Sequence, residues 1–290
     1  MRYRLRRKEQ IGAGLQRVCI EQLDDTCTLL ARGGHDAATL HEARKRLKKI
    51  RAALDLASPA FARVSRSESA SIQKIARMLG PYRETDALAA LLEREARIAG
   101  STDFDFLETS LRLHQIADRG PGDRARDLEV AQQTLLAVRE RIAALEVEEA
   151  PEGLFLRRFR KTYKAARDGA LHLPDRHNGE SLHAFRKAGK RLLNQAWLLA
   201  TRGGDELAAF RNKLVRLDDL LGRSRDCANL AAILRGVPAA EAPLLHGLGL
   251  RVRLERVADE TQTEAARLGR RIYRRPFREF MARALKRVDR

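Results

Sequence analysis

Apolar side chains recur three and four positions apart along most of the chain, which is the spacing of one face of an amphipathic helix. Sustained alternation of apolar and polar positions, the pattern of a half-buried strand, does not occur in the sequence. Ala, Leu, Arg and Glu dominate the periodic stretches, and all four are good helix formers. The pattern therefore predicts an all-α protein.

Glycine and proline residues divide this pattern into separate helices. Clear breaks fall at Gly80-Pro81, Pro151, Gly203-Gly204, Gly222 and Pro276. The predicted helices span residues 5–31, 37–57, 61–79, 82–99, 103–118, 123–149, 153–170, 180–201, 205–221, 224–236, 242–270 and 276–288.

The sequence also repeats itself after 142 positions. The segment LHEARKRLKK at residues 40–49 returns as LHAFRKAGKR at residues 182–191. Without a gap, the same offset aligns Leu79-Gly80 with Leu221-Gly222. The duplication predicts one domain over residues 1–290, built from two helical bundles at 5–145 and 147–290. Such an internal repeat favours a pseudo-two-fold arrangement.

A helical wheel divides each copy of the repeated segment into two faces. At 100° per residue, His41, Arg44 and Lys48 fall on one side of the first copy. An apolar stripe covers another side, formed by Leu40, Ala43, Leu47, Ile50 and Leu54. In the second copy His183 leads the cations, and the stripe is formed by Leu182, Phe185, Leu192 and Ala196.

Like charges three and four positions apart repel one another on a helix. Cations crowded on one face in both copies therefore suggest that each face binds an anion. A solvated helix surface is the alternative interpretation of the charges, and a local structural role is the alternative for each histidine.

A second group of cations flanks the Leu-Gly segment of each half. Gly80 and Gly222 are expected to end a helix with positive φ. Arg83 and Arg225 either pair with the acid that follows each of them or face the anion. The second group of candidate anion-binding residues consists of Lys74, Arg77 and Arg83, with Lys213, Arg216 and Arg225 in the other half.

Composition restricts the class of partner. Lys and Arg number 57 against 39 Asp and Glu, and the net charge of +18 favours a polyanion. Aromatic residues make up only 5%, which argues against binding by base stacking. No apolar stretch is long enough to span a membrane, and no secretory signal is recognised, so no membrane partner is expected. The three cysteines, without a disulfide framework, fit a reducing, cytoplasmic setting.

Catalytic and metal-binding patterns do not emerge from the sequence. The three cysteines contain no CxxC pair, which supports neither a disulfide framework nor a zinc site. A P-loop, an HExxH pair and a dinucleotide fingerprint are all missing. We therefore expect no catalytic residue, no metal and no cofactor.

The pattern His-x-x-Arg-Lys-x-x-Lys-Lys-x-Arg at residues 41–51, its echo at 183–191 and the two Leu-Gly-x-x-Arg segments resemble the CHAD family (conserved histidine α-helical domain). The resemblance implies two helical bundles around a basic groove or pore that binds inorganic polyphosphate without catalysis. It also implies association with polyphosphate granules, whose other proteins are further partners. The second motif departs from the family pattern, which often has Arg-Tyr where this chain has Leu193-Asn194.

The resemblance assigns polyphosphate binding to the residues that match its motif. In the first half these are His41, Arg44, Lys45, Lys48, Lys49 and Arg51, and in the second half His183, Arg186, Lys187, Lys190 and Arg191, with Arg83 and Arg225 in addition. Two alternatives stay open. One is a helical nucleic-acid-binding protein, with nucleic acid as the weaker partner, and the other is a phosphotransfer or polyphosphate enzyme that uses the repeated histidines.

Overall fold

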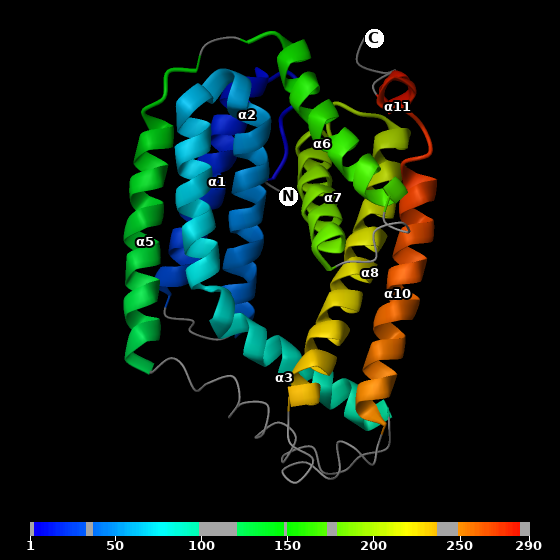
Figure 1. Ribbon diagram of the computed structural model, residues 1–290. Coiled ribbons are helices and arrows are strands. Elements are labelled where there is room, and N and C mark those ends of the chain that lie inside the picture. The colour runs from blue at the N-terminus through cyan, green and yellow to red at the C-terminus, as the bar shows by residue number, and fades with distance from the viewer. Residues whose placement is uncertain are drawn as a thin grey trace.

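The computed structural model describes residues 3–32, 37–98, 121–147, 150–172, 179–236 and 249–284. These residues form helices and connecting turns, and no strand occurs among them. The all-α prediction is thereby confirmed, whereas the helix expected over 103–118 lies outside the described residues. Figure 1 shows two groups of long helices, joined at one end by α3 (Gly80–Ile98).

The first group contains α1 (Ile11–Ala31), α2 (Ala37–Met78) and α5 (Pro121–Ala143). Helix α2 doubles back near Pro59, as Figure 1 shows. Arg44 Nη1 donates to the carbonyl oxygen of Ala76 at 2.5 Å. A straight helix would hold these two residues about 48 Å apart, at 1.5 Å per residue. The helix therefore consists of two antiparallel arms, which match the predictions. We call residues 37–57 the ascending arm and residues 61–78 the descending arm.

The second group contains α6 (Glu152–His172), α7 (Gly179–Leu198), α8 (Asp205–Gly236), α10 (Leu250–Ile272) and α11 (Phe277–Ala284). Its core is aromatic: the Tyr163 ring stacks on Phe280 at 5.3 Å between centroids and meets Tyr273 edge-on at 5.5 Å. Hydrophobic burial of these large rings fixes the packing of α6 against α10 and α11.

The predicted helix break at Gly222 is wrong. Helix α8 runs through this glycine without interruption, and its two predicted halves at 205–221 and 224–236 are one helix. Pro81 follows Gly80 in the first half and removes a backbone donor, but Arg223 occupies the corresponding position in the second half. Of the glycines that the structure describes, Gly249 is the one with positive φ, so the expected left-handed stops at Gly80 and Gly222 are also wrong.

Other helix ends differ from the predictions by several residues. Helix α1 begins at Ile11, because the preceding residues pass over to the second half, where Leu5 N donates to Leu198 O at 2.9 Å. The helix predicted over 123–149 ends at Ala143, and the one predicted from residue 242 is described from Leu250. No helix in the described part of the chain is long and apolar enough to cross a membrane.

Both apolar stripes are buried as predicted, apart from Leu182, which is half-buried near the start of α7. The stripe residues Leu40, Ala43, Leu47, Ile50 and Leu54 are fully inaccessible in α2, as are Leu192 and Ala196 in α7. Phe185 is 1% exposed. Because the stripes fix the rotation of both helices, the cations on the other faces point away from the core.

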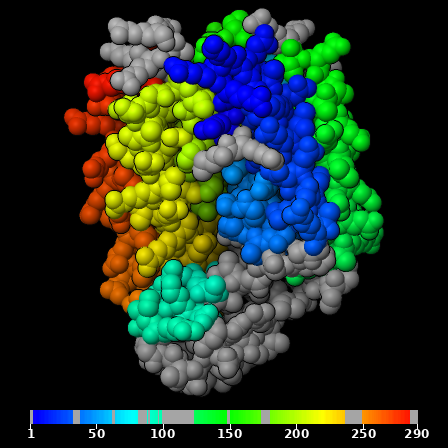
Figure 2. Space-filling view, turned by 180° about the vertical axis from the view of Figure 1, so that it is seen from behind, coloured from blue at the N-terminus to red at the C-terminus, as the bar shows by residue number. Residues whose placement is uncertain are grey.

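Helix α3 leaves the first bundle and packs against the second at the lower ends of α8 and α10 (Figures 1 and 2). Its Leu88 and Leu92 join a separate hydrophobic cluster with Leu230 of α8 and Leu254 of α10. The fully buried Glu95 side chain accepts hydrogen bonds from Arg253 at 3.1 Å and from Arg94 at 2.8 Å. A helix from the first half of the chain is thus anchored against helices of the second half.

Candidate anion-binding site

The cations of the first motif separate into two sets around the ascending arm of α2. Lys45 pairs with Glu42 at 2.8 Å, and Lys49 lies 5.4 Å from the centroid of the Tyr3 ring. Burial lowers the pKa of the Lys49 ammonium. Both lysines therefore belong to the side of α2 that faces the N-terminal segment.

The other set faces the descending arm of α2. Arg51 donates to Gln73 at 2.8 Å and to Ser69 at 3.4 Å, and Arg44 reaches the carbonyl of Ala76 one turn further along. His41 and Lys48 are half-buried on the same arm. The descending arm thus holds the guanidinium groups of Arg44 and Arg51 in place.

The second motif lies on α7 and faces α8. Lys190 forms an ion pair with Asp218, and Arg186 Nη2 lies 3.9 Å from the position that a Cβ on Gly222 would occupy. Lys187 is exposed. Leu193 and Asn194, which replace the expected Arg-Tyr, are both buried, so the basic face of α7 ends at Arg191.

His183 lies in a strongly cationic environment at the start of α7. Burial lowers the pKa of its imidazole, and the charges of Lys187 and Arg225 lower it further. Arg225 is half-buried on α8. The structure therefore brings this cation, which follows a Leu-Gly segment, close to the histidine that begins the motif on α7. A neutral imidazole beside so much positive charge becomes protonated more easily when an anion arrives.

The two motifs meet where α2 packs against α6 and α7. Burial lowers the pKa of the Arg51 guanidinium, and the charges of Arg191 and Arg77 lower it further. Arg51 comes from the first motif and Arg191 from the second. The two halves therefore contribute cations to one electrostatic environment, which we call the seam and define by Arg51, Arg77 and Arg191.

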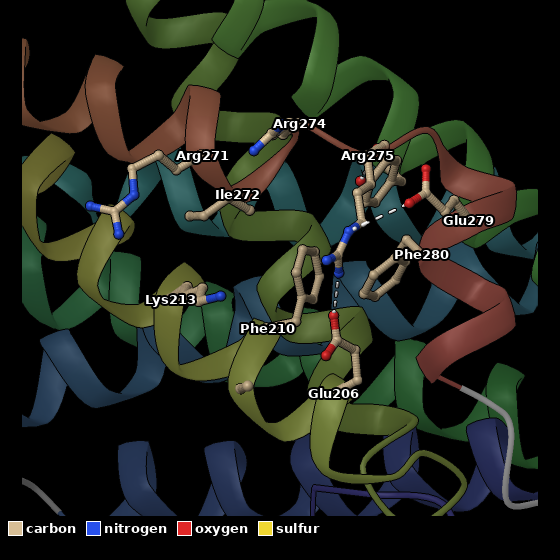
Figure 3. Close-up of a pocket in the computed structure, with 11 residues that line it drawn as sticks. Glu206, Phe210, Lys213, Arg271, Ile272, Arg274, Arg275, Glu279 and Phe280 are labelled. Carbon is tan, nitrogen blue, oxygen red and sulfur yellow. Dashed lines mark hydrogen bonds and ion pairs between the residues drawn. The ribbon is translucent and has the colours of Figure 1, made fainter.

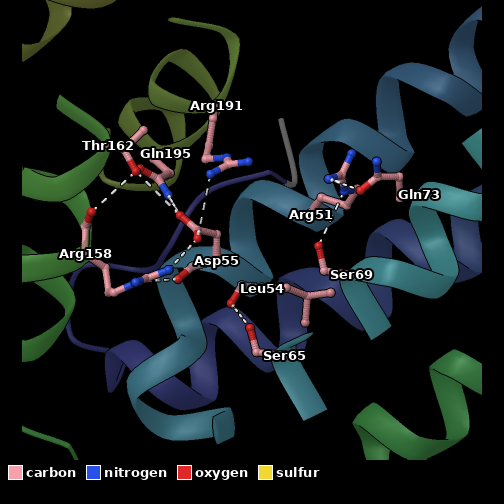
Figure 4. A network of polar contacts seen from close by, with 10 residues as sticks. All are labelled: Arg51, Leu54, Asp55, Ser65, Ser69, Gln73, Arg158, Thr162, Arg191 and Gln195. Atoms are coloured by element: carbon pink, nitrogen blue, oxygen red, sulfur yellow. Dashed lines mark hydrogen bonds and ion pairs between the residues drawn. The ribbon is translucent and has the colours of Figure 1, made fainter. Parts of the chain in front are cut away.

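Asp55 contributes a carboxylate beside the seam, and the sequence pattern did not predict this role. It accepts hydrogen bonds from Arg158 of α6 at 2.6 Å and from Gln195 of α7 at 2.9 Å (Figure 4). Arg191 Nη1 lies 4.0 Å away. Asp55 thus joins the first half to two helices of the second. It is the sole acid of the ascending arm beyond Glu42, which is the signal the sequence offered.

The second cation group is divided among several surfaces. Lys74 and Arg77 are exposed on the descending arm of α2. Arg216 pairs with Glu264 of α10 at 2.5 Å, and Lys213 lines a cavity beside α11. The side chain of Arg83 lies outside the described residues. Lys213 and Arg216 therefore do not gather with the cations of α7.

Gly80 makes room for an arginine. A Cβ at this position would lie 2.8 Å from Arg44 Nη1. The corresponding pair in the second half is Gly222 and Arg186, with a looser distance of 3.9 Å. The glycine of each Leu-Gly segment thus lies beside the first arginine of the His-led motif. At Gly80 the close approach of Arg44 accounts for a glycine without positive φ.

The side chains of this surface have the chemistry that suits an anion. Arg offers forked donors and Lys a compact charge, and both suit phosphate oxygens. Among the residues that the structure describes, no group of three or more His, Cys, Asp or Glu side chains could hold a metal ion. All three cysteines are free and buried, and burial raises the pKa of Cys19 to about 12, so this thiol is a poor nucleophile.

Comparisons with known proteins agree with the helical architecture. The crystal structure of the CHAD domain from the plant Ricinus communis superposes with a TM-score of 0.60 and 19% sequence identity, over 92% of each chain. A search of curated proteins gave no significant match. The family model of the CHAD domain matches residues 17–235, a span that includes both His-led motifs. The chain belongs to the CHAD domain family.

Proposed function

We propose that this chain binds inorganic polyphosphate through a basic groove or pore lined by both repeats, without catalysis. The CHAD family is associated in general with polyphosphate binding. The observation that carries the proposal for this chain is the seam, where burial and the charge of Arg191 on α7 lower the pKa of the Arg51 guanidinium on α2, and where Arg191 also lies 4.0 Å from Asp55 of α2. A linear polyanion lying along the seam would contact both motifs and relieve their repulsion. Within the cell we place the protein at cytoplasmic polyphosphate granules.

The composition supports polyphosphate over nucleic acid. Polyphosphate has no bases or sugars, so its binding needs spaced cations and no aromatic platform. The residues of the two motifs supply the cations, and aromatic residues are only 5% of the chain. Burial also places most of the large rings in the core, where a base along the seam could not stack on them.

A titration at one fixed salt concentration tests the proposal. We expect long-chain polyphosphate to bind at least about tenfold more tightly than duplex DNA or RNA of equal charge, with affinity falling steeply as salt rises. Equal affinity for all three polyanions would overturn the assignment and favour the nucleic-acid alternative. Release of phosphate, or phosphate transfer to His41 or His183, would favour an enzyme.

Binding should strengthen as the pH falls from 8 to 6. The pKa of His183 is lowered in the free protein, and a bound polyanion raises it, so the complex takes up a proton. One proton limits the gain to at most about tenfold per pH unit. Calorimetric titrations in buffers of different ionisation enthalpy measure the uptake. The variant His183→Gln should show a flatter pH profile, and a profile as steep as that of the native protein would contradict this role.

Alanine at Gly80 should weaken polyphosphate binding by about fivefold, which corresponds to the partial loss of one charged hydrogen bond. The new Cβ would displace the head of Arg44, a flexible side chain that can move without unfolding the protein. Two matched glycines serve as controls. Gly222→Ala meets Arg186 only at ordinary contact distance, and Gly189→Ala meets nothing within 4 Å. If Gly189→Ala weakens binding equally, Gly80 does not act through Arg44.

A further inference from the structure

A cavity of about 540 Å³ lies between α6, α8, α10 and α11 (Figure 3). Its apolar wall includes Phe210 and Phe280, whose ring centroids are 4.5 Å apart. Cationic side chains line the remainder: Lys213, Arg271, Arg274 and Arg275. This volume lies in the range typical of sites for small organic ligands, and charged side chains form more of the lining than is usual in such sites.

Positive charge exceeds negative charge in the cavity. The two carboxylates among the lining residues are Glu206 and Glu279, and both contact the same cation. Arg275 Nη1 lies 3.0 Å from Glu206, and Arg275 Nε lies 3.6 Å from Glu279. Within the described part of the chain, the side chains of the other three lining cations form no ion pair or hydrogen bond: Lys213, Arg271 and Arg274.

The wall of the cavity is held together by specific contacts. Tyr163 donates a hydrogen bond from its hydroxyl to the carbonyl oxygen of Arg275 at 2.8 Å, which fixes the link between α10 and α11. Arg275 in turn connects α8 to α11 through Glu206 and Glu279, as the dashed lines in Figure 3 show. In the same view Lys213 and Arg274 extend toward the open space beside Phe210.

The cavity is separate from the His-led motifs. Asp218 and Gly222 mark the side of α8 that faces α7, because they contact Lys190 and Arg186. Lys213 lies about 140° around the helix from Asp218. A polyanion on α7 and a ligand in the cavity would therefore occupy different sides of α8.

The duplication does not require these cations. At the offset of 142 residues, Ser71 corresponds to Lys213, Glu129 to Arg271 and Gln132 to Arg274. A helix carboxyl end attracts nearby cations, which accounts for arginines at the end of α10 but not for a lysine contributed by α8. The charge at this cavity is thus a property of the second half alone.

We propose that this cavity binds a small phosphomonoester that carries a ring, of the size of a nucleoside monophosphate. The phosphate carries close to two negative charges at neutral pH, which suits the three cations without carboxylate partners. The ring would pack against Phe210 and Phe280. A cavity walled by α11 suits a compact ligand better than a long polyanion.

Titration of the full chain with adenosine monophosphate, inorganic phosphate and adenosine at 150 mM salt tests this proposal. We expect saturable one-to-one binding of the monophosphate, weaker binding of phosphate and none of adenosine. The double variant Lys213→Gln with Arg274→Gln should bind the monophosphate at least tenfold more weakly. Its melting temperature should match that of the native protein, and its affinity for polyphosphate should fall by less than about tenfold, since only the long-range field changes.

A control variant that loses the same amount of positive charge distinguishes binding in the cavity from general electrostatic attraction. Arg157→Gln with Lys164→Gln removes two exposed cations from α6 that do not line the cavity. Monophosphate affinity should stay within twofold in this control. Equal losses in both double variants, or no saturable binding at millimolar monophosphate, would overturn the proposal. Phosphate binding as tight as that of the monophosphate would overturn the role of the ring.

Discussion

Exchange of Lys187 for Glu together with Arg191 for Gln should weaken polyphosphate binding at least about a hundredfold. Each charged hydrogen bond contributes roughly 1.5–3 kcal/mol, and the new glutamate adds repulsion. Both side chains are exposed on α7, so the fold should persist. Glutamine is chosen at position 191 because Asp55 lies 4.0 Å from the arginine and would repel a second carboxylate. Fluorescence or calorimetric titration with polyphosphate, alongside far-ultraviolet circular dichroism, measures both effects.

The matched control makes the same change in charge elsewhere. Lys164→Glu with Arg157→Gln alters two exposed cations of α6 that belong to neither motif. We expect a loss of less than about tenfold, since only the long-range field changes. Similar losses in the two double variants would show that net charge, rather than the His-led motif, determines affinity. Arg44 is a less suitable target, because its bond to Ala76 also holds the end of α2.

Replacement of Glu95 by Ala should lower the free energy of unfolding by about 3 kcal/mol. Burial raises the pKa of the Glu95 carboxyl, and the hydrogen bonds from Arg94 and Arg253 outweigh that effect, so the pKa is lowered. Removal of one partner from a buried ion pair costs roughly 3–5 kcal/mol. The lower end applies, since the arginines retain access to water. Urea-induced unfolding, followed by circular dichroism, measures the loss.

Glu93 supplies the control for this prediction, because it lies on the same helix, two residues before Glu95. It pairs with Arg97 at 2.5 Å on the exposed side of α3. Glu93→Ala should cost no more than about 0.5 kcal/mol, as is usual for such pairs within a helix. If both alanine variants unfold at the same urea concentration, the buried carboxylate does not anchor α3.

Local periodicity was sufficient to predict which face of each motif helix is buried. The stripe from Leu40 to Leu54 is inaccessible, because apolar residues three and four positions apart must share one side of a helix. The same pattern cannot tell whether a glycine ends a helix. Gly80 and Gly222 occupy equivalent positions, but proline follows only the first. The second therefore remains inside α8.

Long-range partners were harder to predict, since the sequence of a helix does not identify the helix that packs against it. Lys49 was grouped with the other cations, but it lies against Tyr3, a residue 46 positions earlier. Lys213 was grouped with Arg216 before the Leu-Gly segment, but its side chain lines the cavity beside α10 and α11. Asp55 was missed because its partners, Arg158 and Gln195, come from helices more than 100 residues later.

The position of α3 has a consequence for the origin and the division of this chain. By sequence the helix belongs to the first half, but Leu88 and Leu92 are covered by the second. A gene cut at the connector near Pro151 would yield two fragments that each expose part of a core. Neither fragment should be monomeric and soluble by itself, whereas the pair should reassemble when mixed. If the ancestor was a single repeat, a second copy had to cover this apolar face before duplication joined the two.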